Sequence, residues 1–437
     1  MYTTNKKNKM NYLTLLSLST IFLLTSCGGS GSSPAPLYYD DAVEIELTSD
    51  MLSKPRLAVG FNHSCFITAD NGAVKCWGDN RQGQLGDNKK TQLELEDEYY
   101  ALDPTSNEAK AILQQIINLG KSAPVTVIGI ANAVEISAAE NHTCALLEDK
   151  NVKCWGNNSK RQLGNTILNT QNKNASSTAV DVTSIQGLAV NSISVGSTYG
   201  CALIEGGDIK CWGSTPNGSS AADLLELTNK NPIHLATGSA HACAVLTGNQ
   251  VQCWGDNKYS QLGHINNAAA LVTGIDNALR VSSKSTHSCA LLNTGRVKCW
   301  GYNESGQVGN GERDSKPVTI PALVGGLSKV ISLSSGEQYN CAVTNEGQVL
   351  CWGNNLDSQL GFTSPAGAPD VRPLSPRPKI VVGLTTAKEV SVSQNHSCAF
   401  LSNAANEESV SCWGKNDLGQ LGNRTQMNSA TPVKVVF

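Results

Sequence analysis

The sequence is poor in aromatic residues and in charge of either sign. Aromatic side chains make up 5% and charged side chains 16% of the 437 residues, and the formal net charge is −3. Proteins that bind nucleic acid usually concentrate Lys and Arg on one surface, whereas the basic residues here are scattered after a first cluster of Lys6, Lys7 and Lys9. The composition therefore argues against a nucleic-acid partner, and we expect none.

Motifs that carry common enzymatic chemistry are also missing from the sequence. It contains no G-x-S-x-G, no H-E-x-x-H and no Walker-type glycine loop. Its cysteines show no C-x-x-C spacing, which argues against a structural zinc site. We therefore predict a protein that is not an enzyme, with no catalytic residue, no metal site and no cofactor.

The apolar run near the start, residues 12–24, is too short to cross a membrane as a helix. It follows the positive Lys6 to Lys9 cluster, as in an export signal, and ends at Leu24-Thr25-Ser26-Cys27, which resembles the bacterial lipoprotein signal. The resemblance implies that residues 1–26 are a signal peptide and that Cys27 is lipidated. An ordinary secretory signal is the alternative.

A flexible tether is expected after the signal. Residues 27–40 include the stretch GGSGSSPAP, whose Gly, Ser and Pro content suits a linker between a membrane-held residue and a folded domain. We expect a protein anchored to the membrane through lipid on Cys27 and located in the bacterial cell envelope, at the outer membrane, facing the periplasm or the exterior.

One stretch recurs seven times along the rest of the chain. Its clearest copy is HSCALLNTGRVKCWGYNESGQVG, residues 287–309, and it predicts a β-hairpin followed by a glycine-bounded loop. The other copies begin at His63, His142, Tyr199, His241, Tyr339 and His396. Together the copies contain every tryptophan of the chain: Trp77, Trp155, Trp212, Trp254, Trp300, Trp352 and Trp413.

Each copy carries two cysteines, which leaves Cys27 as the odd one among 15. Paired cysteines in an exported chain indicate a disulfide framework. A three-residue turn centred on Asp149 would place Cys144 opposite Cys154, and the same spacing occurs in five copies. The predicted pairs are Cys65 with Cys76, Cys144 with Cys154, Cys201 with Cys211, Cys243 with Cys253, Cys289 with Cys299, Cys341 with Cys351, and Cys398 with Cys412. The first and last pairs, with wider spacing, require altered turns.

Further strands are predicted on both sides of each hairpin. Runs such as residues 133–137 precede the hairpins, and proline-led runs such as residues 124–127 and 317–320 follow the loops, where proline suits an edge strand. Four short strands per repeat, repeated seven times, predict an all-β fold: a seven-bladed β-propeller of four-stranded blades spanning residues 41–437.

The repeat also resembles a known family. The motifs that carry the resemblance are H-x-C-A-L, V-x-C-W-G-x-N and G-Q-L-G, with P-V-x-V between copies. The chain from about Leu57 to Phe437 is similar to the repeat of the regulator-of-chromosome-condensation propellers. Cysteine at both hairpin positions resembles exported bacterial relatives. The resemblance implies a seven-bladed propeller, but it does not fix a function.

The ends of the chain suggest how the ring closes. Residues 432–436 copy the P-V-x-V strand that precedes other hairpins, whereas the first hairpin, at His63, has no such strand before it. We therefore predict that the last strand completes the first blade.

One insertion, residues 87–123, interrupts the repeats. Its centre, residues 105–120, is expected to be helical, with a capping box at Thr105 and Glu108 and a stop at Gly120. The expected apolar face contains Ala109, Ile112, Leu113, Ile116 and Ile117. We expect the helix to pack on the propeller. The alternatives are that it forms a partner-binding protrusion or that the segment is disordered. The acidic residues 94–98 are expected to be simply solvated.

Histidine and asparagine recur at fixed positions of the repeat. Five histidines lie two positions before the first cysteine, where Tyr199 and Tyr339 stand in the other two copies. Such a repeated position favours a structural hydrogen bond over catalysis. The loop asparagines are expected to form local turn bonds: Asn80, Asn158, Asn257, Asn303, Asn355 and Asn416.

Variable residues in the loop after Cys-Trp-Gly are the candidate partner-binding surface, with ordinary surface variation as the alternative. They are Arg81, Lys160, Arg161, Lys258, Tyr259, Tyr302, Glu304 and Leu356. Equivalent propeller loops open on one face, and aromatic and arginine side chains commonly anchor interfaces. The repeat of Trp212 lacks the Q-L-G element, so its blade should differ on this face.

These features predict a cell-envelope lipoprotein that acts as a non-catalytic propeller for an unidentified protein or other envelope macromolecule. The resemblance to exported inhibitory propellers offers an alternative, an inhibitor of an extracellular or periplasmic enzyme such as a β-lactamase. A third and weaker alternative, implied by eukaryotic relatives, is a guanine-nucleotide exchange factor. Export and the paired cysteines argue against it.

Overall fold

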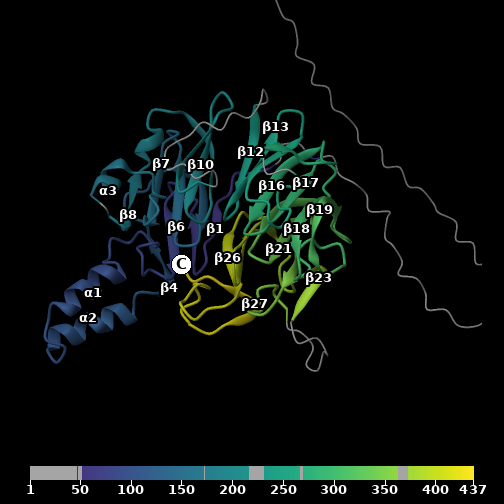
Figure 1. Ribbon diagram of the computed structural model, residues 1–437. Coiled ribbons are helices and arrows are strands. Elements are labelled where there is room, and N and C mark those ends of the chain that lie inside the picture. Colours follow the sequence, from purple (N-terminus) through teal and green to yellow (C-terminus); the bar gives the residue numbers. More distant parts are fainter. Residues whose placement is uncertain (1–46, 48–51, 172, 216–230, 266–268, 363–372) are drawn as a thin grey trace, which may run out of the picture. The chain divides into compact units, whose positions relative to one another are not determined.

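The computed structural model describes residues 47, 52–171, 173–215, 231–265, 269–362 and 373–437. The expected signal peptide, Cys27 and the tether lie outside the described residues. The chain divides into residues 1–41 and 42–437, and every described element belongs to the second unit. Its strands form seven antiparallel sheets that follow one another in chain order (Figure 1). The predicted seven-bladed β-propeller is confirmed.

The first three sheets, or blades, run from residue 57 to residue 213. Blade 1 contains β1 (Leu57–Val59), β2 (His63–Ile67), β3 (Val74–Gly78) and β4 (Lys121–Thr126). Blade 2 contains β5 (Ala133–Ala139), β6 (His142–Leu147), β7 (Val152–Asn157) and β8 (Ala175–Asp181). Blade 3 has three described strands, β9 (Val190–Val195), β10 (Tyr199–Ile204) and β11 (Ile209–Gly213).

The other four blades each show all four strands. Blade 4 contains β12 (Pro232–Thr237), β13 (His241–Leu246), β14 (Val251–Gly255) and β15 (Ala270–Leu271). Blade 5 contains β16 (Ala278–Lys284), β17 (His287–Leu292), β18 (Val297–Asn303) and β19 (Asp314–Leu323). Blade 6 contains β20 (Val330–Ser335), β21 (Tyr339–Thr344), β22 (Val349–Asn354) and β23 (Leu374–Ile380). Blade 7 contains β24 (Ala387–Val392), β25 (His396–Ser402), β26 (Glu408–Gly414) and β27 (Ser429–Lys434).

Every repeat hairpin is closed by a disulfide. In blade 2 the register places Cys144 opposite Cys154 and Leu146 opposite Val152, as the sequence predicts. All seven predicted pairs are bonded, with Cα atoms 4.0 to 4.1 Å apart. In blade 7 the wider spacing is absorbed by a longer hairpin, which reaches the pair Ser402 and Glu408. Directly opposed strand positions therefore accommodate the bonds without a change of register.

The hydrophobic core lies between blades rather than within them. The Cys65–Cys76 disulfide of blade 1 packs in one cluster with Ile136 and Trp155 of blade 2. Six of the seven tryptophans donate their indole N–H, at 2.8 to 3.0 Å, to the backbone carbonyl of the Q-L-G glutamine in the preceding blade. The glycine of that element must lack a side chain, because a Cβ on Gly164 would lie 2.7 Å from the Trp212 ring.

The repeated histidine also contacts the next blade. His63, His241, His287 and His396 each share a hydrogen bond of 2.7 to 2.9 Å with a side chain of the following blade, namely Thr143, Ser288, Asn340 and Ser64. The two tyrosines reach further: the Tyr199 hydroxyl donates to the backbone carbonyl of His241, and the Tyr339 hydroxyl to that of His396. These bonds show that the position is a structural one, as predicted. His142 differs, because Gly200 follows Tyr199 in the next blade and offers no side chain.

Ring closure differs from the prediction. The last strand, β27, pairs with β26 inside blade 7, and β1 to β4 complete blade 1 without it. The ends still meet, but through side chains: the Phe437 ring packs edge-on against Trp77 and tilted against Phe66 of blade 1. The P-V-x-V pattern thus marks an outermost strand of its own blade, so it carries no information about closure.

A second closing contact comes from the segment before β1. The Arg56 guanidinium forms a two-point ion pair with Glu408 of blade 7 at 2.7 and 2.8 Å and lies over the Phe66 and Phe400 rings. The backbone amides of Arg56 and Leu57 donate to the buried Glu389 carboxylate. Burial raises the pKa of Glu389 to about 7, although these hydrogen bonds favour its charged form.

The insertion contains two helices rather than one. Helix α1 (Gln92–Tyr100) covers the acidic segment expected to be merely solvated, and its capping box is Thr91 with Glu94. Helix α2 (Asn107–Ile117) begins at the Ser106 N-cap instead of at Thr105, whose side chain bonds Asp103. The two helices lie side by side (Figure 1).

The expected apolar face of α2 is only partly covered. Ala109 is buried, whereas Leu113 and Ile117 are exposed. One further short helix, α3 (Thr166–Thr170), follows β7. None of the helices in the described ranges is long and apolar enough to cross a membrane.

Removing the Arg56 side chain should loosen the closure of the ring. We expect Arg56→Met to lower the free energy of unfolding by about 1 to 3 kcal/mol, since it removes a two-point ion pair and two cation–π contacts. The matched control is Lys329→Met, which breaks an exposed ion pair with Glu346 inside blade 6 and should cost about 0.5 kcal/mol or less. Equal losses in urea unfolding would contradict a special role for Arg56.

The buried histidines should make the fold sensitive to acid. Burial lowers the pKa of His287 to about 4, against its hydrogen bond to Asn340. The unfolded chain therefore binds a proton on this ring below about pH 6.5, while the folded chain does so only near pH 4. The stability that the neutral ring contributes is present above this window and is lost as the pH falls through it.

A pH series of urea unfolding checks this. Between about pH 6.5 and pH 4, the free energy of unfolding of the wild type should fall relative to that of His287→Gln by about 1.4 kcal/mol for each pH unit. Val297→Ala on the same hairpin is the control, because it removes buried apolar surface and its cost should not vary with pH. A constant difference between wild type and His287→Gln from pH 7 to pH 4 would refute the assignment.

Candidate functional site

The strand order gives the propeller two distinct faces. In each blade the first and third strands run in the same direction, so both end on the same face of the propeller. The loops after Cys-Trp-Gly follow the third strand and therefore lie on this face. We call it the loop face. The opposite face carries the hairpin turns, such as residues 148–151, and residues 52–56, which we call the strap. All eight predicted partner-binding residues lie on the loop face.

A constant scaffold supports the loops of this face. In six loops the predicted asparagine accepts a hydrogen bond, at 2.8 to 3.2 Å, from the backbone amide of the residue before the final glycine. The Q-L-G glutamine accepts another from the amide two residues before it. The expected local turn bonds of the asparagines are confirmed, and they hold the variable residues between them in defined positions.

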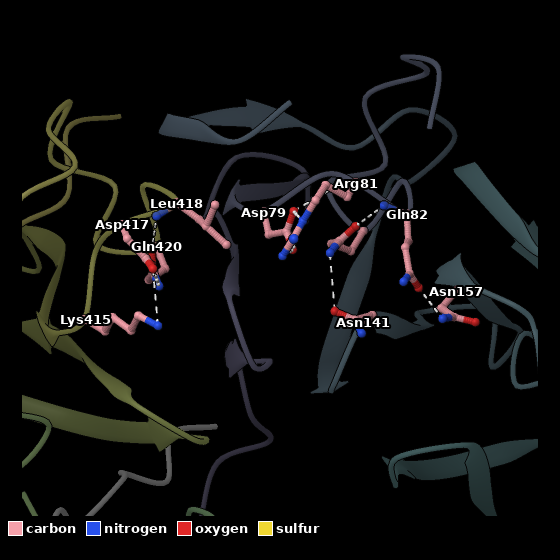
Figure 2. Close-up of polar contacts among 10 residues, drawn as sticks. Asp79, Arg81, Gln82, Asn141, Asn157, Lys415, Asp417, Leu418 and Gln420 are labelled. Carbon is pink, nitrogen blue, oxygen red and sulfur yellow. Dashed lines mark hydrogen bonds and ion pairs between the residues drawn. The ribbon is translucent and has the colours of Figure 1, made fainter. Parts of the chain in front are cut away.

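Blades 7, 1 and 2 form one polar stretch of the loop face. Arg81 is tied to Asp79 through Nε and one terminal nitrogen at 2.7 to 3.0 Å, and these bonds raise the pKa of the guanidinium above its usual value. Figure 2 shows this pair between two other contacts. On one side Lys415 pairs with Asp417 of blade 7, and on the other the Asn157 amide of blade 2 donates to Gln82.

A groove borders this stretch. It has a volume of about 820 Å³ and lies between helix α1 and the loops of blades 1 and 2. Leu93, Glu96 and Asp97 line the helix side, while Phe61 and Arg81 line the propeller side. The backbone amide of Gln92 donates to the Arg81 carbonyl at 2.7 Å, so the helix begins directly on the loop. The insertion therefore adds a wall to the loop face.

A second cluster joins blades 4 and 5. The Tyr259 and Tyr302 rings meet edge-on with centroids 5.0 Å apart, and the Lys258 ammonium lies 5.3 Å from the Tyr259 centroid. The Tyr302 hydroxyl donates to Glu304. Four of the predicted residues are thus brought together, and their mutual contacts hold two aromatic rings in place at the surface.

The remaining three predicted residues are not part of either cluster. Leu356 is 60% exposed on the loop of blade 6. Lys160 and Arg161 are exposed on the loop of blade 2. Arg161 has a φ of 63° and occupies the left-handed position that Gly83 and Gly306 occupy in other loops, so its backbone serves the turn.

Two elements of the loop face escaped the sequence prediction. Helix α1 was signalled by the Thr91-x-x-Glu94 capping box, but its acidic composition suggested solvated coil. The Asp79 carboxylate fixes Arg81, and nothing local in the sequence distinguishes it from a surface acid. Within the described residues, no group of three or more His, Cys, Asp and Glu side chains is arranged to hold a metal ion. The corresponding loop of blade 3 includes residues 216–230, which lie outside the described residues.

Family comparison identifies the repeat. Residues 56–84, 133–162, 233–261, 279–307 and 330–359 match one model of the regulator of chromosome condensation (RCC1) repeat, and residues 294–343 match a second. Curated relatives match over short segments. An X-linked retinitis pigmentosa GTPase regulator homolog of Caenorhabditis elegans is 36% identical over 25% of this chain, and a probable E3 ubiquitin-protein ligase, HERC6 of Homo sapiens, is 31% identical over 29%. The matched regions span 7% and 12% of those relatives.

Solved structures share the whole architecture. Prp20p of Saccharomyces cerevisiae, whose structure was reported with its binding to Gsp1p and histones, superposes with a TM-score of 0.70 at 18% identity over 90% of each chain. Human WBSCR16 superposes with a TM-score of 0.61 at 18% identity, covering 73% of this chain and 85% of that one. At such identity the likeness concerns the fold. Five blades of this seven-bladed propeller therefore carry regulator of chromosome condensation repeats.

Proposed function

We propose that this protein is a lipid-anchored protein of the bacterial cell envelope whose loop face binds a protein partner without catalysing a reaction. The observation that carries the proposal is the contrast between a constant scaffold and the variable side chains held on it. The asparagine and glutamine bonds recur from blade to blade, whereas the exposed residues between them differ in each loop. Such an arrangement suits recognition of a particular surface.

The composition of the loop face supports a protein partner. Tyr259, Tyr302 and Arg81 are residue types that commonly anchor protein interfaces, and each is already held by a neighbour before any partner arrives. Side chains fixed in this way lose little conformational entropy on binding. The groove beside helix α1 extends the same face, so a partner could contact the cluster of blades 4 and 5, the groove, or both.

The expected anchor is compatible with this use. The strap, which follows the proposed tether, lies on the face opposite the loops. Attachment there would leave the loop face open to a partner. The inhibitor alternative uses the same face and differs in its consequence, since the partner would then be an enzyme that loses activity on binding.

Substitutions on the loop face should weaken partner capture. We expect the double substitution Lys258→Glu with Tyr259→Ala, or Arg81→Glu alone, to reduce cross-linked recovery of a partner from native envelopes by about tenfold or more, since interface anchors of this kind carry much of the binding free energy. Glu148→Lys, in a hairpin turn of the opposite face, is the control and should leave recovery unchanged. Recovery that survives both loop-face variants would count against the proposed surface.

The anchor has its own test. Cys27→Ala should abolish incorporation of labelled palmitate and release the protein from the membrane fraction, because the acyl chains would attach to that sulfur. Cys65→Ala with Cys76→Ala, which removes a hairpin disulfide, should leave labelling intact. A membrane-bound, labelled Cys27→Ala protein would contradict the lipoprotein assignment.

A further inference from the structure

The centre of the propeller contains a channel that the strap crosses at one end. The innermost strands of all seven blades line a channel of about 550 Å³. On the face opposite the loops, residues 52–55 of the strap lie against this channel. The Arg280 guanidinium of blade 5 donates to the Ser53 carbonyl at 2.6 Å, and Lys54 contacts Asn191 of blade 3 and Glu135 of blade 2. The strap is therefore fixed to blades 5, 3 and 2 and crosses the channel at this end.

Lys284 stands at the other end of the channel, on the side of the loop face. It occupies the position three residues before the repeated His or Tyr, where the other six repeats have small residues: Gly60, Ala139, Gly196, Gly238, Gly336 and Ser393. Its ammonium group reaches from blade 5 to the Ala138 carbonyl of blade 2, 3.4 Å away. Blades 2 and 5 are not neighbours in the ring, so the side chain spans the channel.

The Lys284 ammonium has few partners for a partly buried charge. It has three donors, and among the described residues its hydrogen bond to Ala138, at the long end of the usual range, is the one that forms. Glu140 and Glu337 attract the ammonium from beyond ion-pair distance and so favour its charged form. The positive charge of Lys284 in turn helps to lower the pKa of the nearby His63 and His142. Burial lowers the pKa of Lys284 to about 8, so the group remains largely charged at pH 7. A charge that is partly removed from water is stabilised by an opposite charge at ion-pair distance, and none of the described residues provides one for Lys284.

We propose that Lys284 is the receptor for a carboxylate that enters the channel from the loop face. One carboxylate would neutralise the ammonium and accept its free N–H donors, whereas a phosphate dianion would leave excess negative charge near Glu140 and Glu337. Ser194, Thr237 and Ser335 line the same end of the channel. The Ser194 and Thr237 hydroxyls share a hydrogen bond of 2.8 Å, and the Ser335 hydroxyl donates to the Ser282 carbonyl, so Lys284 is the group there with donors to spare. The carboxylate is either a free small acid or an acidic side chain of a partner, and the second source rests on the proposed function of the loop face.

Titration calorimetry of the full chain with two probes separates these sources. Succinate represents a free acid, and the blocked peptide acetyl-Gly-Glu-Gly-amide represents a protein side chain, with acetyl-Gly-Gln-Gly-amide as its neutral counterpart. We expect saturable binding of at least one carboxylate probe and none of the Gln peptide. Lys284→Met should weaken that binding by about 10- to 100-fold, the effect of losing a charge-assisted hydrogen bond, while Lys284→Arg should retain part of it.

Two controls keep the result interpretable. Lys89→Met removes an exposed lysine of the same face and should leave the affinity unchanged. The thermal unfolding temperature of Lys284→Met should match or exceed that of the wild type, because the substitution removes a partly buried charge that makes one long hydrogen bond, so loss of binding would not reflect loss of fold. Binding of neither probe, or undiminished binding by Lys284→Met, would overturn the inference. Either result could occur while partner capture by the loop face persists, so the two proposals fail independently.

Discussion

The contact between each tryptophan and the preceding blade is the interaction on which the rest of this structure depends. The indole ring fills the core between two blades, its N–H donates to a glutamine carbonyl, and its edge rests on a glycine that has no room for a side chain. The disulfide of the preceding hairpin lies in the same cluster, and the repeated histidine bonds across the same boundary. A single blade buries neither its own tryptophan nor its own disulfide, so the blades are stable as a closed set rather than one at a time.

This dependence explains why the sequence was sufficient to predict the fold. Cysteine spacing within a hairpin is local, so the opposition of Cys144 and Cys154 followed from turn length alone. The order of blades followed from seven copies in phase. Closure did not follow, because an outermost strand has the same P-V-x-V pattern whether it pairs with its own hairpin or with the first one. What joins the ends is instead a set of residues that occur once, Arg56 and Phe437 among them.

The candidate site was predictable in position but not in detail. Antiparallel topology places every loop after Cys-Trp-Gly on one face, so the eight residues were expected there correctly. Which of them touch depends on side-chain directions that no repeat encodes: Tyr259 meets Tyr302 across a blade boundary, while Arg161 serves a turn. Lys284 departs from the small residues of the other six repeats, but the sequence does not show what its side chain faces. Its neighbours in sequence are ordinary strand residues, and its isolation becomes evident when the ring places it opposite Ala138.

The position of the strap across one end of the channel has a thermodynamic consequence for the proposed function. Because the strap crosses one end, a carboxylate at Lys284 and a protein on the loop face would meet at the other end of the channel. A partner that presents its own acidic side chain would gain from Lys284, and a free acid already bound there would compete with it. A partner without such a group would trap or expel the bound acid, and linkage requires each ligand to change the affinity of the other by the same factor. The sign of that coupling therefore reports whether the partner itself enters the channel.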